Sequence, residues 1–358
     1  MTIPGMMKGM VLTGHGGLDR LEWREDLPVP VPAAGEVLIR VGAAAINNTD
    51  VNTRTGWYSK AIRGDTASGA AKGYGNLVEK DGGWSGAALS FPRIQGADCC
   101  GEIVAHGTDV PAARVGERVL VRAVQPAAGA GTGVGASTFG SERDGAFAEY
   151  TCVASENAVA IQSGLSDVEL ASFPCAFSTA EGMIQRASLG AERVLVTGAS
   201  GGVGSAAVQL ARRRGAHVTA VSSPQKVDAL RELGADEVLA RDAEPPAQAF
   251  DVVLDLVGGA WWPALVEALH PGGRYVTAGA IAGPIVELDL RTLYLRDLAF
   301  FGCTHQPASV FADLVRYIEA GEIRPVVART YPLQDLRAAQ EAFLSKVHVG
   351  KICLVVRE

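Results

Sequence analysis

A glycine-rich segment in the middle of the chain has the residue types and spacing of a dinucleotide-binding turn. The apolar stretch RVLVTGA runs into Ser200, Gly201, Gly202, Val203 and Gly204, and a stretch with helical apolar spacing follows. Glycines let the backbone approach a pyrophosphate, and a helix N-terminus supplies N–H groups and a positive dipole. Because an apolar strand precedes the glycines and an amphipathic helix follows them, the segment predicts a dinucleotide site rather than an empty tight turn.

A second glycine-rich run, Gly131 to Gly135, offers a comparison within the same chain. No stretch with the spacing of an amphipathic helix follows it, so no helix N-terminus would face a phosphate there. We therefore interpret this second run as part of a loop.

The residues after the second strand of the same half indicate which dinucleotide is bound. An NAD site usually has Asp or Glu about 20 residues after the glycines, where it binds the ribose 2′-hydroxyl. Here the strand ends in VSSPQK, without a carboxylate. Ser222 can donate a hydrogen bond to a 2′-phosphate and Lys226 can supply positive charge, although a solvated lysine without a role remains an alternative for Lys226. We therefore expect NADP(H) as the cofactor.

Two different sequence patterns divide the chain into two parts, and both parts would contribute to this site. Up to about residue 155, short alternating stretches and Pro- and Gly-rich turns indicate β structure, and residues 8–60 are expected to form strands and turns. From about residue 163, strands alternate with helices, which predicts βαβ units and a parallel sheet. The first helix of this part is expected near Ser166, where SDVE has the spacing of a capping box.

Composition excludes several classes of partner. The 358 residues carry a net charge of −7, which argues against a surface for nucleic acid or anionic membrane. No apolar run is long enough to span a bilayer, and MTIPGMMKGM lacks the apolar core of a signal peptide. The six cysteines include no CxxC pair, which favours a reduced, cytoplasmic protein. We expect a small-molecule substrate and neither a nucleic-acid nor a membrane partner.

Four ordered motifs resemble the medium-chain dehydrogenase/reductase superfamily, and within it the zinc-independent quinone oxidoreductases. They are INNTDVNTRTGWY, DGAFAEYTCV, RVLVTGASGGVG and HVGKICLVV. The resemblance implies an α/β plus β fold with a GroES-like β-barrel catalytic domain over residues 1–158, a Rossmann cofactor-binding domain over 159–306, and a return to the catalytic domain over 307–358. It places the active site in the cleft between the domains. It also implies a homodimer, in which the expected edge strand LAFFGCT pairs across a two-fold axis.

The same resemblance shows that two zinc-ligand positions have changed. Zinc alcohol dehydrogenases have a Cys and a Gly-His-Glu motif where this chain has Asn47 and Gly96-Ala97-Asp98. A catalytic zinc needs three protein ligands with N, S or O donors. Neither Asn47 nor Ala97 serves well in that role, and no Cys lies between Cys100 and Cys152 to form the four-Cys lobe of a structural zinc. We predict that no metal is bound.

One cluster looks superficially like a metal site: Asp98, Cys99, Cys100 and His106 lie close together in the sequence. In a strand, however, Cys99 and Cys100 point to opposite faces. We therefore interpret both cysteines as core residues.

The resemblance also assigns residues to the cleft. Asn47, Asp50, Arg54 and Tyr58 match positions that line the nicotinamide pocket of quinone oxidoreductases, and Tyr58 matches the proton donor of related enoyl-thioester reductases. A phenol can act as a general acid when it lies within hydrogen-bond reach of a forming enolate. Two alternatives stay open: Tyr58 as a packing aromatic, and Asp50 with Arg54 as a structural ion pair. Three further positions match residues that face the cofactor: Thr179, Gly279 and Cys303.

Two Gly-rich stretches, residues 60–90 and 126–145, are not covered by the resemblance and are interpreted as long surface loops. The first follows directly on Tyr58, carries seven glycines, and has Trp84 and Phe91 as apolar anchors. We hypothesise that residues 63–90 form a lid that shapes substrate choice. A solvated insertion without a role is the alternative.

These features together predict an activity. Without a metal acting as a Lewis acid, reduction of an isolated carbonyl loses its usual electrophile, whereas conjugation in an activated C=C bond delocalises the developing charge. We predict an NADPH-dependent oxidoreductase that transfers hydride to a quinone or another activated C=C or carbonyl substrate. The alternatives are an enoyl-thioester reductase, a zinc-type alcohol dehydrogenase and a non-catalytic NADPH-binding protein.

Overall fold

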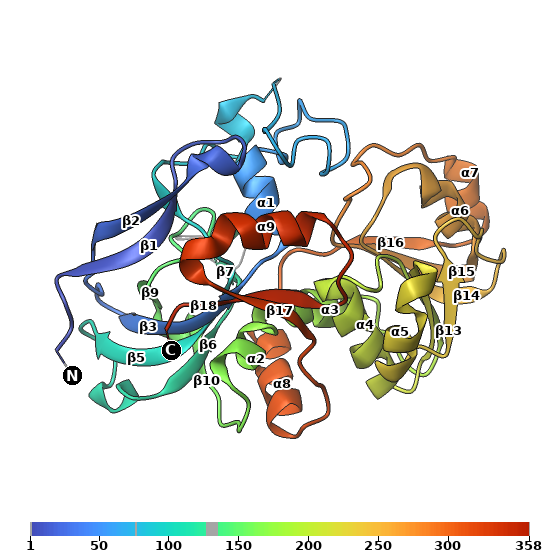
Figure 1. Ribbon diagram of the computed structural model, residues 1–358. Coiled ribbons are helices and arrows are strands. Elements are labelled where there is room, and N and C mark those ends of the chain that lie inside the picture. The colour runs from blue at the N-terminus through green and yellow to red at the C-terminus, as the bar shows by residue number, and fades with distance from the viewer. Residues whose placement is uncertain (1, 76, 127–134, 358) are drawn as a thin grey trace.

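The first part of the chain folds as a β lobe, shown in blue and cyan in Figure 1. The computed structural model describes residues 2–75, 77–126 and 135–357. Within these residues one sheet has the strand order β10-β6-β5-β3-β18-β17, with β9 also paired to β3; a second sheet is β2-β1-β4, and β7 pairs with β8. The strands are β1 (Met6–Leu12), β2 (Leu21–Pro28), β3 (Glu36–Ala45), β4 (Arg93–Ile94), β5 (Asp98–His106), β6 (Arg118–Val121), β7 (Val124–Pro126), β8 (Ala136–Thr138), β9 (Tyr150–Ala154) and β10 (Ala158–Ala160).

The second part forms the predicted parallel sheet, with strand order β13-β12-β11-β14-β15-β16 among the described residues. Val194 and Val196 pack into the core shared with helices α3 and α4, whereas Leu195 between them packs into the core on the opposite face. The sheet is therefore buried on both faces, as continuous apolar strands require. Its elements are α3 (Pro174–Arg186), β11 (Arg193–Val196), α4 (Gly202–Arg213), β12 (His217–Ser222), α5 (Val227–Glu232), β13 (Glu237–Ala240), β14 (Phe250–Asp255), α6 (Trp262–Glu267), β15 (Leu269–Thr277), α7 (Leu290–Leu295) and β16 (Ala299–Gly302).

The end of the chain crosses back to the β lobe. Helix α8 (Ala308–Glu319) packs against α3 and shares the core of the parallel-sheet lobe. Strands β17 (Val327–Pro332) and β18 (Lys351–Val355) then join the large sheet of the β lobe, where β18 pairs with β3, and helix α9 (Leu336–Leu344) lies between them in sequence. In Figure 1 the red elements β17, β18 and α9 cross the middle of the molecule, and the orange α8 lies below them. The predicted fold class, a GroES-like β lobe with a Rossmann lobe, is confirmed.

Helix α1 (Asn48–Thr55) corrects the prediction that residues 8–60 form only strands and turns. Asn47 and Asp50 form a reciprocal capping box at its start, and Gly56 ends it with a φ of 74°. Val51 is the one large apolar residue of the helix, so hydrophobic periodicity gives no helical signal there. The Asn-x-x-Asp spacing is the sequence signal that could have found it. By contrast, the capping box at Ser166 does open a helix, α2 (Asp167–Ala171), as predicted.

The two Gly-rich stretches differ in structure. The described residues of the first, 60–75 and 77–90, form turns, bends and irregular backbone with one 3₁₀ turn at Glu79–Asp81. The described flanks of the second form the hairpin β7–β8 rather than an irregular loop throughout, and most of the run from Gly131 to Gly135 lies outside the described residues.

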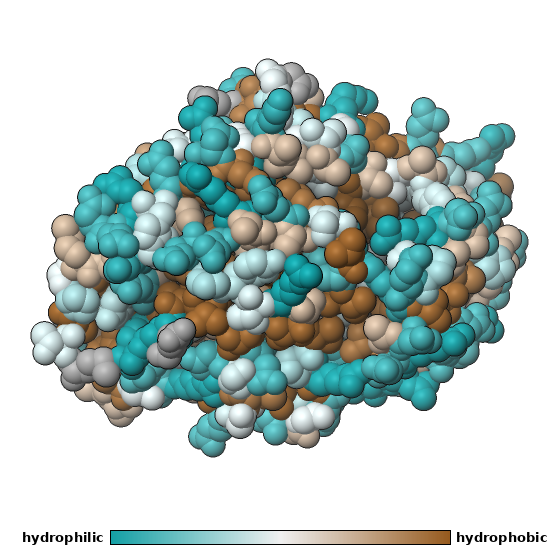
Figure 2. All heavy atoms as spheres, viewed as in Figure 1, coloured by the Kyte–Doolittle hydropathy of each residue, from teal (hydrophilic) through white to brown (hydrophobic). Residues whose placement is uncertain are grey.

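The face of the protein shown in Figure 2 is mostly polar. Hydrophilic side chains cover most of the face shown in Figure 2, and hydrophobic residues show between them across the middle, near β17 and β18. No helix in the described part of the chain is long and apolar enough to cross a membrane.

Candidate active site

The glycine-rich segment has the predicted strand–turn–helix geometry. Strand β11 ends at Val196, Gly201 is extended at the N-cap, and α4 starts at Gly202. A Cβ on Gly204 would lie 2.2 Å from the carbonyl oxygen of Gly198, so only glycine lets the helix start this close to the strand. Val203, within the first turn, is half-buried. The turn therefore presents backbone N–H groups at a helix N-terminus, which can receive a pyrophosphate.

Lys226 is tied to this turn, which excludes the solvated lysine considered from the sequence. Its Nζ donates to Ser200 Oγ (3.2 Å) and to the carbonyl oxygens of Lys346 (2.7 Å) and His348 (2.8 Å), and the residue is 7% exposed. Gly350 N also donates to the carbonyl oxygen of Ser200. The segment before β18 is thus fastened onto the glycine turn.

Several positive charges gather beside the turn. Burial and the neighbouring Arg241 lower the pKa of Lys226. Burial and Lys226 lower the pKa of Lys346 to about 8, and burial followed by nearby lysines lowers the pKa of His348 to about 4. Like charges that depress one another's pKa would be relieved by a bound anion. This pattern fits the phosphates of a dinucleotide.

Ser222 and Arg241 lie side by side at the carboxyl edge of the sheet. Ser222 ends β12 and pairs in register with Ala240, the last residue of β13, so Arg241 follows at the same edge. The Ser222 hydroxyl is buried and has no hydrogen-bond partner among the described residues. A bound ligand could supply the partner that such a buried donor needs. Arg241 was missed in the sequence; a basic residue directly after the next parallel strand is the signal that could have found it.

Asn47 and Asp50 lie together at the start of α1. Asp50 accepts hydrogen bonds from Asn47 N (2.8 Å) and Ala97 N (3.2 Å) and is 1% exposed. Burial raises the pKa of Asp50 to about 7. The described ion pairs do not join Asp50 to Arg54, so the structural ion pair considered from the sequence is not formed.

The prediction that Arg54 lines the nicotinamide pocket needs correction, because its side chain is fully buried and hydrogen-bonded inside the β lobe. Its guanidinium donates to Gln340 Oε1 (2.9 Å) and to the carbonyl oxygens of Gly16 (2.8 Å) and Ala70 (2.9 Å). Burial lowers the pKa of Arg54 to about 10. It joins α9, an N-terminal turn and the first Gly-rich stretch, so it stabilises the lobe and does not line the nicotinamide pocket.

Tyr58 has a polar partner for its hydroxyl, which donates to Thr49 Oγ1 at 3.0 Å. Burial raises the pKa of Tyr58 well above its usual 10, against hydrogen bonds with Thr49 and Asn52 that lower it. The phenol is therefore protonated at neutral pH. Within the described part of the chain, the side-chain oxygen of the buried Asn52 has no hydrogen-bond partner. Thr49 was missed in the sequence, since its role depends on where the chain after α1 brings Tyr58.

The three remaining candidates lie around helix α3 and the carboxyl ends of β15 and β16. Thr179 Oγ1 donates to the carbonyl oxygen of Cys175 at 2.7 Å, within α3. Gly279 follows β15, where a Cβ would lie 3.0 Å from the carbonyl oxygen of Leu256. Cys303 follows β16; its N–H donates to the Thr277 carbonyl, and its buried thiol lies against α3. The edge is the one at which parallel sheets bind ligands.

The residues of this chain at the zinc-ligand positions of zinc alcohol dehydrogenases do not suit a metal ion. Asn47 Oδ1 accepts a hydrogen bond from Lys351 Nζ (2.5 Å), and Ala97 has no donor atom. Asp98 is already paired with the Lys351 ammonium at 2.8 Å. Burial raises the pKa of the nearby Cys175 thiol well above its usual range, so the thiol is not a thiolate at neutral pH. Because a cation already occupies the carboxylate, this set of residues does not fit zinc.

Cys99 and Cys100 are core residues, as their alternation predicts. Cys99 packs into the core of the β lobe and Cys100 into the core shared with α3. In the described part of the chain, no three His, Cys, Asp or Glu side chains are grouped closely enough to hold a metal ion.

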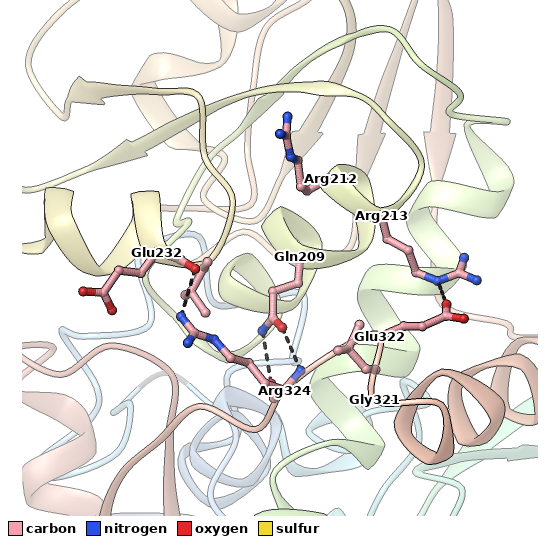
Figure 3. A pocket seen from close by; sticks show the side chains of 9 residues that line it. Gln209, Arg212, Arg213, Glu232, Gly321, Glu322 and Arg324 are labelled. Atoms are coloured by element: carbon pink, nitrogen blue, oxygen red, sulfur yellow. Dashed lines mark hydrogen bonds and ion pairs between the residues drawn. The ribbon is translucent and has the colours of Figure 1, made fainter.

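A surface hollow of about 610 Å³ lies elsewhere, between the ends of α4, α5 and α8 (Figure 3). Its arginines are already engaged: Arg213 with Glu322, and Arg324 with the Glu232 carbonyl oxygen. It contains none of the candidate residues predicted from the sequence, so we place the candidate site at the glycine turn and the start of α1 instead.

Comparison with known proteins places this geometry among dehydrogenases. Residues 33–163 match the family described as alcohol dehydrogenase GroES-like domain, and residues 233–354 match the family described as zinc-binding dehydrogenase. The chain is 44% identical to a solved structure from Sinorhizobium meliloti 1021, provisionally classed as an alcohol dehydrogenase, which covers 99% of this chain and 97% of that one with a TM-score of 0.86.

Two curated relatives carry names that specify a reaction. Acryloyl-coenzyme A reductase of Metallosphaera sedula is 29% identical over 97% of this chain and 99% of its own length. The NADPH-dependent alkenal/one oxidoreductase of Arabidopsis thaliana is 26% identical over 98% of this chain and 80% of its own length.

Proposed function

Because the chain belongs to the medium-chain dehydrogenase/reductase superfamily and is an oxidoreductase, we propose that it transfers hydride from NADPH to an activated C=C bond without zinc. The observation that carries this proposal is the protonated Tyr58 hydroxyl, 3.0 Å from Thr49 Oγ1, in a cleft whose zinc-ligand positions hold Asn47 and Ala97. Both curated relatives described above are named for reduction of substrates with a conjugated C=C bond.

The residues of this chain divide the work of the reaction. NADPH, when bound, supplies the hydride that the β-carbon of the substrate accepts. The glycine turn at Gly202 and Gly204 holds the pyrophosphate, and Ser222 with the nearby cations holds the 2′-phosphate. Tyr58 then donates its proton to the enolate that forms, and Thr49 holds the phenol in place until it does so.

The experiment that tests this proposal is oxidation of NADPH against a panel of quinones, enones, enoyl thioesters, and saturated ketones and aldehydes. We expect turnover of the conjugated compounds and little turnover of the saturated ones. An enoyl thioester as the best substrate would favour the second candidate, an enoyl-thioester reductase, which the 97% coverage by acryloyl-coenzyme A reductase supports. Reduction of saturated ketones alone would contradict the proposal.

The purified protein is expected to contain far less than one zinc per chain. Lys351 already neutralises Asp98, and Ala97 offers no donor, so a zinc ion would lack the three ligands it needs. Elemental analysis and activity after dialysis against a chelator measure this. One tightly held zinc per chain, with activity lost on its removal, would show that the prediction is wrong.

The protein is expected to form a homodimer through the edge of the parallel sheet. Strand β16 pairs only with β15 among the described residues, so its other edge is available for pairing. Shortly before β16 in the chain, residues 285–295 carry several exposed large apolar side chains, and an apolar cluster of this kind marks protein interfaces: Ile285, Val286, Leu288, Leu290, Tyr294 and Leu295.

Light scattering at micromolar concentration tests the dimer. Leu290→Asp, in the apolar cluster, should shift the protein toward monomer, because a charge would be buried in the interface. Val31→Asp is the matched control, since Val31 is equally apolar, is 88% exposed and lies in the β lobe. A wild-type protein that is monomeric at this concentration would contradict the predicted homodimer.

The first Gly-rich stretch is expected to control substrate choice. The Thr66 N–H donates to the carbonyl oxygen of Ile281 at 3.0 Å, so the stretch reaches from Tyr58 in the β lobe to the loop after β15. Replacing residues 63–88 with a short Gly-Ser bridge should change relative rates across the panel and leave the Kd for NADPH unchanged.

A second variant separates this effect from instability, because the deletion also removes the Ala70 carbonyl that Arg54 binds. Thr66→Pro removes the N–H and the hydroxyl that both donate to the Ile281 carbonyl oxygen, and it leaves the Ala70 carbonyl in place. Unchanged relative rates in both folded variants would leave the stretch without a role in specificity.

A further inference from the structure

The buried ion pair between Asp98 and Lys351 lies where the cleft meets the cofactor turn. Asp98 is 0% exposed and Lys351 is 3% exposed. Their charged atoms are 2.8 Å apart, and Lys351 Nζ also donates to Asn47 Oδ1 (2.5 Å) and the Ile46 carbonyl oxygen (2.8 Å). Removing two charges from water is costly, and their attraction repays the cost only when geometry is good and the remaining atoms are hydrogen-bonded. Both conditions are met here.

The carboxylate joins the starts of two helices from different lobes. Asp98 Oδ1 accepts the Cys175 N–H (2.6 Å), in the first turn of α3, and Asp98 Oδ2 accepts from Asn47 Nδ2 (2.8 Å), at the N-cap of α1. Helix α3 carries Thr179, and α1 carries Thr49, the partner of Tyr58. One buried carboxylate thus sets the separation between the cofactor side and the acid side of the cleft.

The lysine reaches the cofactor turn as well. A Cβ on Gly202 would lie 2.8 Å from Lys351 Cδ, so the aliphatic part of Lys351 lies directly against the first residue of α4. The side chain therefore runs from the glycine turn to Asp98 and Asn47. The resemblance to zinc alcohol dehydrogenases implies metal-ligand positions in both of these last two segments, whereas here an ammonium group connects them.

We propose that Lys351 and Asp98 are positioning residues that replace a metal as the link between the cofactor turn, the start of α1 and the start of α3. Neither residue donates a proton to substrate. Their ion pair holds Tyr58 and the cofactor-binding helices at the separation that hydride transfer requires. This inference rests on the proposed function for its kinetic consequence, but its structural consequence stands without it.

The kinetic experiment compares Lys351→Met, Lys351→Arg and the charge-neutral double variant Asp98→Asn with Lys351→Met. Misplacement of reacting groups lowers turnover more than binding, so we expect Lys351→Met to lower kcat about 10- to 100-fold with little change in KM. Lys351→Arg should recover part of the loss, since it restores the charge. The double variant should fold well, because it leaves no unpaired buried carboxylate. Its kcat should stay low, because the ion pair that connects the cofactor turn with α1 and α3 is still missing.

The second measurement needs no substrate. Cys175 lies in the α3 turn that Asp98 holds, so its alkylation rate, followed residue by residue by mass spectrometry, reports how firmly that turn is held. We expect it to rise about tenfold in Lys351→Met and in Asp98→Asn. The matched control is Arg214→Met, which removes the cation facing the buried Glu181 on the same helix α3 but leaves its first turn alone.

The outcomes separate the two proposals. Faster Cys175 alkylation with no activity on any conjugated substrate, even in the parent, supports the link and contradicts the proposed function. If kcat of the folded variants matches the parent, or if Arg214→Met changes kcat and Cys175 alkylation as strongly as Lys351→Met, the pair contributes only general stability and the inference is overturned.

Discussion

Replacing Tyr58 with phenylalanine is expected to lower kcat by about 10²- to 10⁴-fold, the usual contribution of a positioned general acid, without changing the Kd for NADPH. The substitution removes one hydroxyl that donates to Thr49 and leaves the ring. Because Tyr58 is partly exposed in the cleft, the loss of one hydrogen bond costs the fold only about 0.5–1.5 kcal/mol. Steady-state kinetics with the best substrate of the panel and titration of NADPH fluorescence measure the two effects.

The pH dependence adds a check on the same residue. Burial holds the pKa of Tyr58 above its usual 10, so the acid is protonated throughout the neutral range. The proton it donates is therefore present below that pKa and lost only when the pH rises through it. We expect no decline of kcat from Tyr58 up to about pH 10.

Two further variants test whether the effect is specific to the Tyr58 hydroxyl. Tyr331→Phe is the matched control, because Tyr331 lies on β17 and its hydroxyl contacts only Arg329 among the described hydrogen bonds. Thr49→Val should reduce kcat less than Tyr58→Phe, since it removes the partner and keeps the acid. If Tyr58→Phe keeps kcat within about threefold of the parent, a difference below 1 kcal/mol, Tyr58 only shapes the pocket.

Removing the cations at the edge of the sheet is expected to weaken NADPH binding selectively. A charged hydrogen bond contributes about 1.5–3 kcal/mol, so Arg241→Ala should raise the Kd for NADPH by about 10- to 150-fold. The three hydrogens of the Lys226 ammonium are already donated to protein oxygens, so Lys226→Ala should raise this Kd through the loss of its charge and of the attachment that it gives the glycine turn. NADH has no 2′-phosphate, so its Kd should change little in Arg241→Ala. The parent should prefer NADPH, because neither Ser222 nor Arg241 repels the phosphate.

Lys226 and Arg241 should differ in a second respect. Lys226 also fastens the glycine turn to the carbonyl oxygens of Lys346 and His348, so Lys226→Ala should weaken NADH binding as well and lower the melting temperature. Arg241 is exposed, and its loss should leave the fold unchanged.

The control for cofactor binding is Arg193→Ala. Arg193 is an exposed arginine at the amino end of β11, the edge opposite the glycine turn. Equal affinity for NADPH in the parent and in both variants would exclude a role for these cations. Tighter binding of NADH than NADPH by the parent would show that the cofactor preference is wrong.

Features that depend on near neighbours in the chain could be predicted from the sequence. The glycine turn needs a strand, three glycines and a helix within a dozen residues, and all were recognisable. The alternation of a strand placed Cys99 and Cys100 in different cores, and the spacing at Ser166 identified a helix start. Each of these depends on local backbone geometry, so the residues themselves contain the information.

The roles of the charged residues depended on chain segments far apart. Arg54 hydrogen-bonds Gln340, 286 residues away, and Lys351 hydrogen-bonds Asn47, 304 residues away. A guanidinium or ammonium has similar chemistry in a cleft, in a core or in water, and only the tertiary partners decide between these roles. Burial then decides the role of each cation, because a cation removed from water needs hydrogen-bond acceptors within the protein. Arg54 and Lys351 found theirs inside the protein, whereas Arg241 stays exposed beside the unpartnered Ser222 hydroxyl, where a phosphate can bind.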